Sequence, residues 1–146
     1  MDIRNLLELL NENSCRYLVI GALAFPHYGY ARATLDIDIF IEPSPGNADK
    51  VHHALEAFGF DVSDITTRDL LEFKLLIREY ALQLDVHPFV TGVEFDNVWS
   101  NRVQTNIKGV PVWVPSLEDL IVMKKAAGRQ KDLEDLRYLE RLRDRS

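Results

Sequence analysis

Two aspartates stand one residue apart in a segment where apolar and acidic residues alternate, Leu35-Asp36-Ile37-Asp38-Ile39. On a β-strand, residues i and i+2 point to the same face, so both carboxylates would project together, with their Cα atoms about 6–7 Å apart. Carboxylates this close repel each other, and a divalent cation such as Mg²⁺, which prefers oxygen ligands, relieves the repulsion. The spacing therefore indicates a metal site. The alternative is an amphipathic strand whose polar face meets solvent.

Residues that could handle phosphate lie just upstream of these aspartates. Gly21-Ala22 follows the apolar run Tyr17–Ile20 and begins a short predicted helix, and small residues there let backbone N–H groups at a helix N-terminus approach a phosphate. Arg32 offers a guanidinium fork for phosphate, and Thr34 is in register with the two aspartates on the same strand face. The alternatives are a simple turn glycine at Gly21 and, at Arg32, a surface arginine or one paired with a carboxylate.

A third carboxylate, Asp85, lies in the apolar segment Leu82–Val86. If that segment forms a strand beside the first, Asp85 completes a cluster of three carboxylates, which would bind two metal ions. Asp61 and Asp64 are the other candidates for this role, but they occupy a less strand-like stretch. His87 shares the face of Asp85, and we interpret it as a surface histidine at the end of the strand, with substrate contact as the alternative.

The elements that must position these residues follow from periodicity and from turn and cap signals. We predict helices over 3–12, over 47–58, from the N-cap Ser116 to about Ala127, and from about Lys131 onward, and strands over 17–20, 35–41, 73–77, 82–86, 103–107 and 110–114. The last two pairs of strands form hairpins, and Phe58, Phe60 and Phe73 fit the core. The pattern predicts one α+β (mixed α/β) domain over residues 1–146, with a small mixed β-sheet flanked by helices and a C-terminal helical part over about 115–146.

Composition narrows the class of protein. The 146 residues are 47% hydrophobic and 27% charged, as in globular domains. Cys15 is the only cysteine, which excludes an intramolecular disulfide and suits a cytoplasmic protein, and no apolar run reaches the about 20 residues of a membrane span. The net charge of −6 argues against a broad nucleic-acid-binding surface.

The basic residues concentrate at the C-terminal end, from Lys124 onward, whereas the upstream part carries the acidic excess. Most of these C-terminal charges form a solvated helix face. We single out Lys124 and Arg129 as phosphate contacts, and we interpret Asp132 and Asp135 as groups that pair helices. Four aromatic residues close to the Gly-Ala turn are interpreted as packing residues, with a wall for a base or ribose as the alternative: Phe25, His27, Tyr28 and Tyr30.

The strings Val19–Ala24 and Arg32–Asp38 together resemble the nucleotidyltransferase superfamily of the DNA polymerase β type, and most closely its minimal bacterial branch, which includes abortive-infection-type nucleotidyltransferase toxins. The signature of that family is a Gly-(Gly/Ser) turn, a spacer, Asp-x-Asp and a third acidic residue on a later strand. Residues 115–124 and 129–136 are similar to its closing helices, where a lysine and an Arg-x-Lys-Asp-x-x-Asp segment close over the nucleotide pocket. Ala22 departs from the signature and removes a hydroxyl contact to phosphate.

The resemblance implies an enzyme that transfers a nucleoside monophosphate from an NTP such as ATP to an acceptor hydroxyl on an RNA, a protein or a small molecule. It also implies a partner protein, as in a toxin–antitoxin pair. The catalytic and metal-binding residues would be Asp36, Asp38 and Asp85, holding two Mg²⁺ or Mn²⁺ ions, and the nucleotide-binding residues would be Gly21, Ala22, Arg32, Thr34, Lys124 and Arg129. One alternative is a non-catalytic, regulatory nucleotide- and metal-binding protein on the same fold. A purely structural module is the other.

Overall fold

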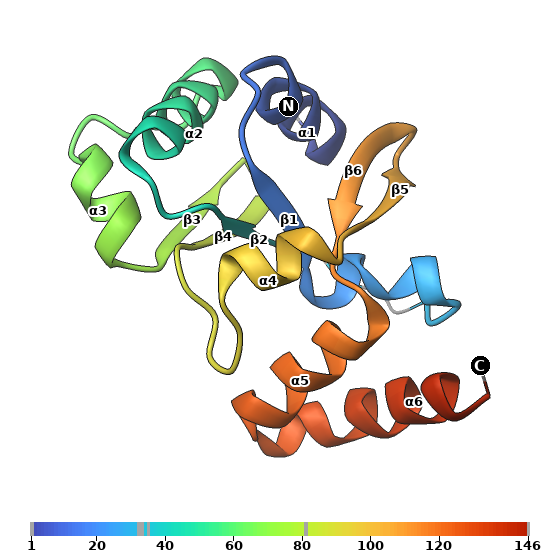
Figure 1. Cartoon of the computed structure of the whole chain (residues 1–146). Helices are drawn as coiled ribbons and strands as arrows, with labels where there is room; N and C mark the ends of the chain where they lie inside the picture. Colours follow the sequence, from blue (N-terminus) through green and yellow to red (C-terminus); the bar gives the residue numbers. More distant parts are fainter. Residues whose placement is uncertain (1, 32–33, 35, 81, 146) are drawn as a thin grey trace.

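The computed structural model describes residues 2–31, 34, 36–80 and 82–145. Its centre is a four-stranded mixed sheet in the order β1-β2-β4-β3 (Figure 1). The strands are β1 (Tyr17–Ile20), β2 (Asp36–Ile41), β3 (Leu75–Glu79) and β4 (Leu82–His87). The two central strands, β2 and β4, run parallel, whereas the two outer strands pair antiparallel with their neighbours. This confirms the prediction of an α+β fold with a small mixed sheet.

Alternation along the central strands separates a buried face from a polar one. Ile37 and Ile39 of β2 and Leu84 of β4 are fully buried. Since the side chains of a strand alternate between its two faces, the aspartates between these apolar residues lie on the opposite face. The register pairs Asp38 of β2 with Asp85 of β4. The two central strands therefore collect their carboxylates on one face while their other face enters the core.

The apolar face of the sheet is covered by helices from the first half of the chain (Figure 1). These are α1 (Ile3–Glu12) and α2 (Pro45–Phe58), with α3 (Thr67–Glu72) packed against α2. A capping box between Asp2 and Asn5 begins α1, which satisfies backbone N–H groups that have no partner within the helix. Buried side chains of α1 and α2 complete the core beneath the strands: Leu6, Leu7, Leu10, Val51 and Leu55.

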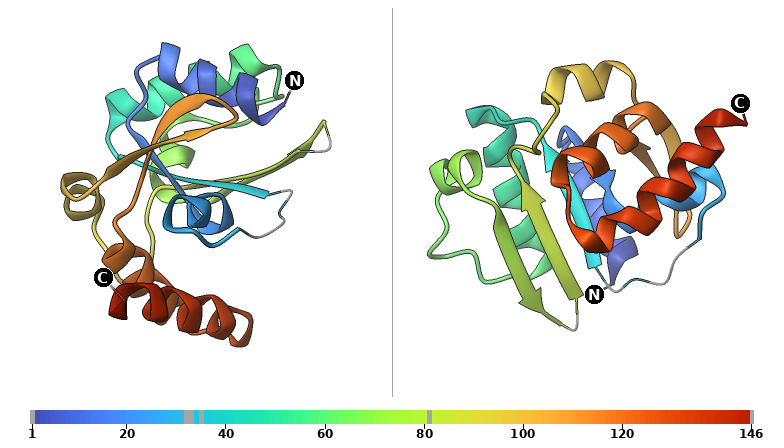
Figure 2. Two further views of the ribbon diagram at one scale, coloured as in Figure 1. Left: turned by 90° about the vertical axis from the view of Figure 1, so that its right-hand side faces the viewer. Right: turned by 90° about the horizontal axis from the view of Figure 1, so that it is seen from below.

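The polar face of the sheet meets the C-terminal helices α5 (Leu117–Ala127) and α6 (Leu133–Asp144). Ser116 caps α5 as predicted, and Gly128, in the left-handed conformation, ends it. Seen from below, α5 and α6 lie to the side of β3 and β4 and leave those two strands open to view (Figure 2). The helices therefore cover only part of this face.

A separate hairpin, β5 (Val103–Ile107) and β6 (Val110–Val114), forms over the predicted residues and packs against β1. It follows α4 (Phe95–Ser100), which was not predicted; α3 was also missed, because helices of six residues carry little periodicity. None of the helices in the described part of the chain combines the length and the apolar character that crossing a membrane requires.

Three element predictions need correction. The helix predicted after Gly21 is instead a pair of 3-10 turns, Gly21–Leu23 and Phe25–Tyr28, because Pro26 lacks an N–H and Gly29 turns the chain into the left-handed region. The helix predicted over 47–58 begins at Pro45, since proline is tolerated in a first turn. Phe73 caps the end of α3 instead of starting β3, and its side chain is 59% exposed, so its core assignment was wrong.

Candidate active site

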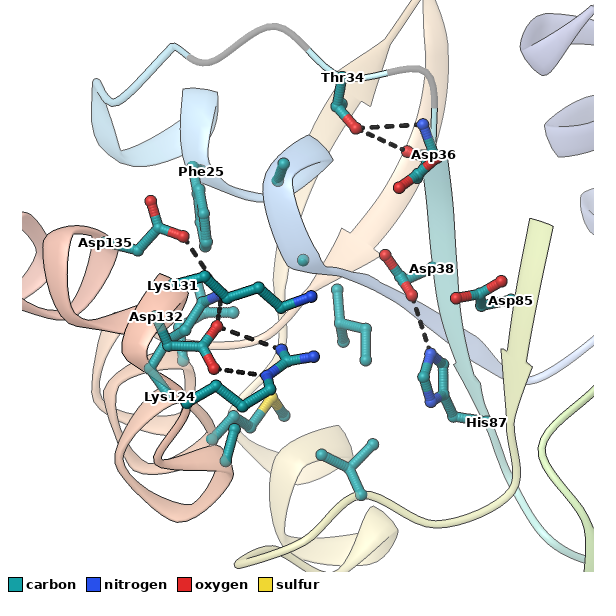
Figure 3. Close-up of a pocket in the computed structure, with 18 of the residues that line it drawn as sticks. Phe25, Thr34, Asp36, Asp38, Asp85, His87, Lys124, Lys131, Asp132 and Asp135 are labelled. Carbon is teal, nitrogen blue, oxygen red and sulfur yellow. Dashed lines mark hydrogen bonds and ion pairs between the residues drawn. The ribbon is translucent and has the colours of Figure 1, made fainter. Parts of the chain in front are cut away.

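A cavity of about 290 Å³ lies between the polar face of the sheet and the C-terminal helices (Figure 3). Every predicted site residue that the structure describes lines it: Gly21, Ala22, Thr34, Asp36, Asp38, Asp85, Lys124 and Arg129. Arg32, the remaining predicted site residue, lies outside the described residues. Asp61 and Asp64, the alternatives to Asp85, lie between α2 and α3 and do not line this cavity. The fold thus brings together residues that are more than 100 positions apart in the sequence.

Asp38 and Asp85 lie at paired positions on the parallel strands β2 and β4. One ligand atom from each of them and one from His87 all lie within 4.8 Å of one another. The Nε2 atom of His87 lies 2.9 Å from Oδ1 of Asp38. This donor set of two carboxylates and an imidazole fits a divalent metal ion.

His87 is therefore not the surface residue that we predicted. Its side chain is only 15% exposed and lines the cavity. The alternation of β4 contained the signal, because a residue two positions after Asp85 on the same strand must share its face.

Asp36 begins β2, two residues before Asp38, and is exposed, outside the three-residue cluster of Asp38, Asp85 and His87. Its backbone N–H donates a hydrogen bond of 3.0 Å to Oγ1 of Thr34. Thr34 precedes β2, so it is not part of the strand as predicted, although it does line the cavity. Asp36 and Thr34 together form the edge of the cavity where the chain enters β2.

Gly21 meets the Asp38 carboxylate at close range. Its φ angle is +71°, and a Cβ atom at this position would lie 2.8 Å from Oδ2 of Asp38. Both the backbone conformation and the contact therefore disfavour a larger residue. The chain turns here with bare backbone facing the Asp38 carboxylate.

Asp85 is neutralised by two cations that sequence reasoning did not assign. Nη1 of Arg78 lies 2.8 Å from Oδ1 of Asp85, and Nζ of Lys74 lies 3.7 Å from Oδ2. Arg78 belongs to β3, and Lys74 immediately precedes that strand. Their spacing of four places them on one strand face, but only the pairing of β3 with β4 brings that face to Asp85.

On the opposite side of the cavity, Lys124 of α5 joins two buried carboxylates. Its Nζ atom lies 3.0 Å from Asp132 and 3.3 Å from Asp135, whose side chains are 4% and 3% exposed. Nε of Arg129 lies 2.6 Å from Asp132. Burial by itself would raise the pKa of Asp132, but the hydrogen bonds from Arg129 and Lys124 lower it to about 2. These contacts join α5 to α6, as expected for Asp132 and Asp135.

The aromatic residues near the turn act mainly in packing. Tyr30 stacks on Phe25 and on Tyr138, with ring centroids 5.4 and 4.2 Å apart, and its hydroxyl donates to Asp135. Phe25 lines the cavity, and the Nζ atom of Lys124 lies 5.4 Å from its ring centroid. Phe25 thus supplies an apolar wall beside the basic side of the cavity.

Comparisons with known proteins bear on the family and the fold. A family model described as "nucleotidyltransferase of unknown function (DUF6036)" matches residues 1–143. The crystal structure of a candidate nucleotidyltransferase from Thermotoga maritima is similar to this fold, with a TM-score of 0.57 and 15% sequence identity, covering 99% of this chain and 91% of that chain. None of the curated proteins compared matches the chain. The match over nearly the whole sequence shows that the chain belongs to this family of nucleotidyltransferases.

Proposed function

We propose that this protein is a metal-dependent enzyme that transfers a nucleoside monophosphate from an NTP to an acceptor hydroxyl. The observation that carries the proposal is the position of Asp38 opposite Asp85, with cations from the C-terminal helical part lining the same cavity. An NTP needs both features, because metal ions neutralise its phosphates and cationic side chains orient them.

Asp36, Asp38 and Asp85 would hold divalent ions, with Mg²⁺ or Mn²⁺ as the candidates. Such ions, when bound, neutralise the phosphate charge that develops during transfer. Gly21 and Ala22 present bare or nearly bare backbone to the triphosphate. Lys124, Arg129 and Thr34 line the walls around it, and the proposal assigns Arg32 to the same task.

The transfer itself forms one bond and breaks another. The acceptor oxygen attacks the α-phosphorus, and the bond from this phosphorus to the pyrophosphate oxygen breaks. The Asp85 carboxylate takes the proton of the acceptor hydroxyl, and Arg78 and Lys74 pair with that carboxylate. Most of the rate enhancement comes from positioning and charge neutralisation.

The proposal includes three wider assignments. Residues 1–146 act as one domain of the DNA polymerase β-like type, the acceptor is an RNA, a protein or a small molecule, and a partner protein controls the activity as in a toxin–antitoxin pair. The support for the partner is the resemblance of the Gly-Ala turn and the Asp-x-Asp pair to the abortive-infection-type branch. Co-purification of the chain with the product of a neighbouring reading frame tests this assignment.

The direct test incubates the purified protein with Mg²⁺ or Mn²⁺, NTPs labelled at the α-phosphate, and tRNA, protein or small hydroxyl-bearing acceptors. Transfer of label together with pyrophosphate release, absent from an Asp36→Asn/Asp38→Asn double variant, supports the proposal. Binding of metal and nucleotide without pyrophosphate release favours the regulatory alternative. Absence of both binding and release overturns the proposal.

A further inference from the structure

The proposed function assigns three carboxylates to the metal site and gives His87 no role. This histidine is the last residue of β4, and the burial of β4 alternates so that Gln83, Asp85 and His87 share its less buried face. Its side chain is largely buried and faces the cavity, although the strand ends here and solvent is close. Among the described residues, the imidazole of His87 forms its hydrogen bond with Asp38.

We infer that His87 is a nitrogen ligand of the metal ion that Asp38 and Asp85 hold, and that it makes the site prefer a first-row transition ion to Mg²⁺. The inference rests on the proposed function for the metal-binding role of the two aspartates. It adds a ligand that the Gly-Ala turn and the Asp-x-Asp pair do not specify.

The separation of the donor atoms fits this role. Two ligands at right angles on a six-coordinate ion, each bonded at about 2.1 Å, lie about 3.0 Å apart. Nε2 of His87 and Oδ1 of Asp38 lie 2.9 Å apart. The pair thus already has the spacing of two adjacent ligands, and the ligand atom from Asp85 lies within 4.8 Å of both.

The surroundings leave this imidazole available to a metal. The neighbouring cations, Lys74 and Arg78, pair with Asp85. Binding replaces the hydrogen bond between His87 and Asp38 with two bonds to one ion.

The preference follows from ligand chemistry. Mg²⁺ favours oxygen ligands and keeps several of its waters. Divalent first-row transition ions also accept imidazole nitrogen, and their affinity for such a site increases from Mn²⁺ towards Cu²⁺. One imidazole beside two carboxylates therefore raises the affinity for transition ions while adding little for Mg²⁺. We expect Mn²⁺ to bind at least about ten-fold more tightly than Mg²⁺.

The experiment uses the purified full chain with Mn²⁺ alone, since nucleotide would add nitrogen atoms of its own. Titration followed by electron paramagnetic resonance gives the Mn²⁺ affinity, and competition gives the Mg²⁺ affinity. Pulsed measurements detect nitrogen hyperfine coupling from a directly bound imidazole, and histidine labelled with the heavy nitrogen isotope identifies its source. The wild-type spectrum tests the inference without depending on the folding of any variant.

Two variants complete the design. His87→Gln keeps an N–H that can donate to Asp38 but removes the imidazole, and His53→Gln changes an exposed histidine on α2 as a matched control. We expect His87→Gln to lose the nitrogen coupling and about ten-fold or more in Mn²⁺ affinity, with Mg²⁺ affinity nearly unchanged. His53→Gln should behave as wild type.

The inference is overturned if the wild-type spectrum lacks histidine coupling, or if folded His87→Gln keeps the Mn²⁺-to-Mg²⁺ preference. Either result leaves the proposed function standing when metal-dependent transfer persists. If Asp38→Asn binds Mn²⁺ as well as wild type does, or if the wild type binds no divalent ion, both the inference and the proposed metal site fail.

Discussion

Asp38 lies directly opposite Asp85 on two neighbouring parallel strands, β2 and β4. Each carboxylate has a partner of its own: His87 contacts Asp38, whereas Arg78 contacts Asp85. The like charges of the two aspartates are thus held close by flanking groups from β3 and β4. Arg78 and Lys74 already neutralise Asp85, whereas Asp38 has no Lys or Arg partner among the ion pairs of the described residues. The pair therefore gives the sharpest predictions about this protein.

Asp38→Asn should remove the activity. The substitution takes a charged oxygen away from the proposed metal site, and losing metal-based stabilisation of several kcal/mol corresponds to at least about a 10³-fold fall in kcat/KM. The measurement is pyrophosphate release under saturating metal. Asp64→Asn, on the exposed loop between α2 and α3, is the matched control and should retain wild-type activity. Near-normal turnover by Asp38→Asn would place the chemistry elsewhere.

Gly21→Ala should weaken metal binding, because its methyl group would lie 2.8 Å from the Asp38 carboxylate. Gly29→Ala is the control: its φ is +88°, but no atom lies within 4 Å of the added carbon. Both variants should lose about 1–2 kcal/mol of unfolding free energy through backbone strain. Only Gly21→Ala should lower the affinity for Mn²⁺, measured by titration. Equal metal affinity in the two variants would argue against a ligand role for Asp38.

Lys124→Met should raise the KM for the NTP by about ten-fold, since Lys124 supplies a cation to the wall of the cavity. The change also leaves Asp132 and Asp135 without their lysine, which should cost about 2–4 kcal/mol of stability. Steady-state kinetics well below the melting temperature separate the two effects. Lys125→Met, next in the chain with a half-exposed side chain, should change neither value appreciably. An unchanged KM in folded Lys124→Met would remove Lys124 from the nucleotide site.

Asp132 should make the fold sensitive to acid. Burial raises its pKa, but the hydrogen bonds from Arg129 and Lys124 outweigh burial and bring the folded-state value to about 2, below the ordinary 3.8. A carboxyl with a lowered pKa stabilises the native state above its unfolded pKa, and this contribution is lost as pH falls from about 4 to about 2. Denaturant unfolding over this range should show Asp132 contributing about 1–2 kcal/mol.

The comparison for this effect is Asp132→Asn, whose unfolding free energy should be lower at neutral pH and should fall less steeply between about pH 4 and pH 2. Asp144→Asn removes an exposed carboxylate near the end of α6 and should retain the wild-type slope. Parallel acid profiles for wild type and Asp132→Asn would show that the contacts of Asp132 do not stabilise the fold.

Local sequence rules determined much of this protein. Alternation of apolar and acidic residues predicted β2 and the shared face of Asp36 and Asp38. The Ser116 cap and Gly128 bounded α5, and the hairpin β5–β6 formed over the predicted residues. These features depend on backbone geometry within a few residues, so the order of residue types suffices to specify them.

Only the tertiary structure decided which distant groups meet. The parallel pairing of β2 with β4 placed Asp85, and not Asp61 or Asp64, beside Asp38, and it brought His87 to Asp38. The pairing of β3 with β4 brought Arg78 to Asp85. Packing of α5 against α6 joined Lys124 to two buried carboxylates. Strand order and the partners of charged side chains depend on the free energy of burying the core as a whole. That free energy comes from contacts between distant residues, so no short stretch of sequence reveals it.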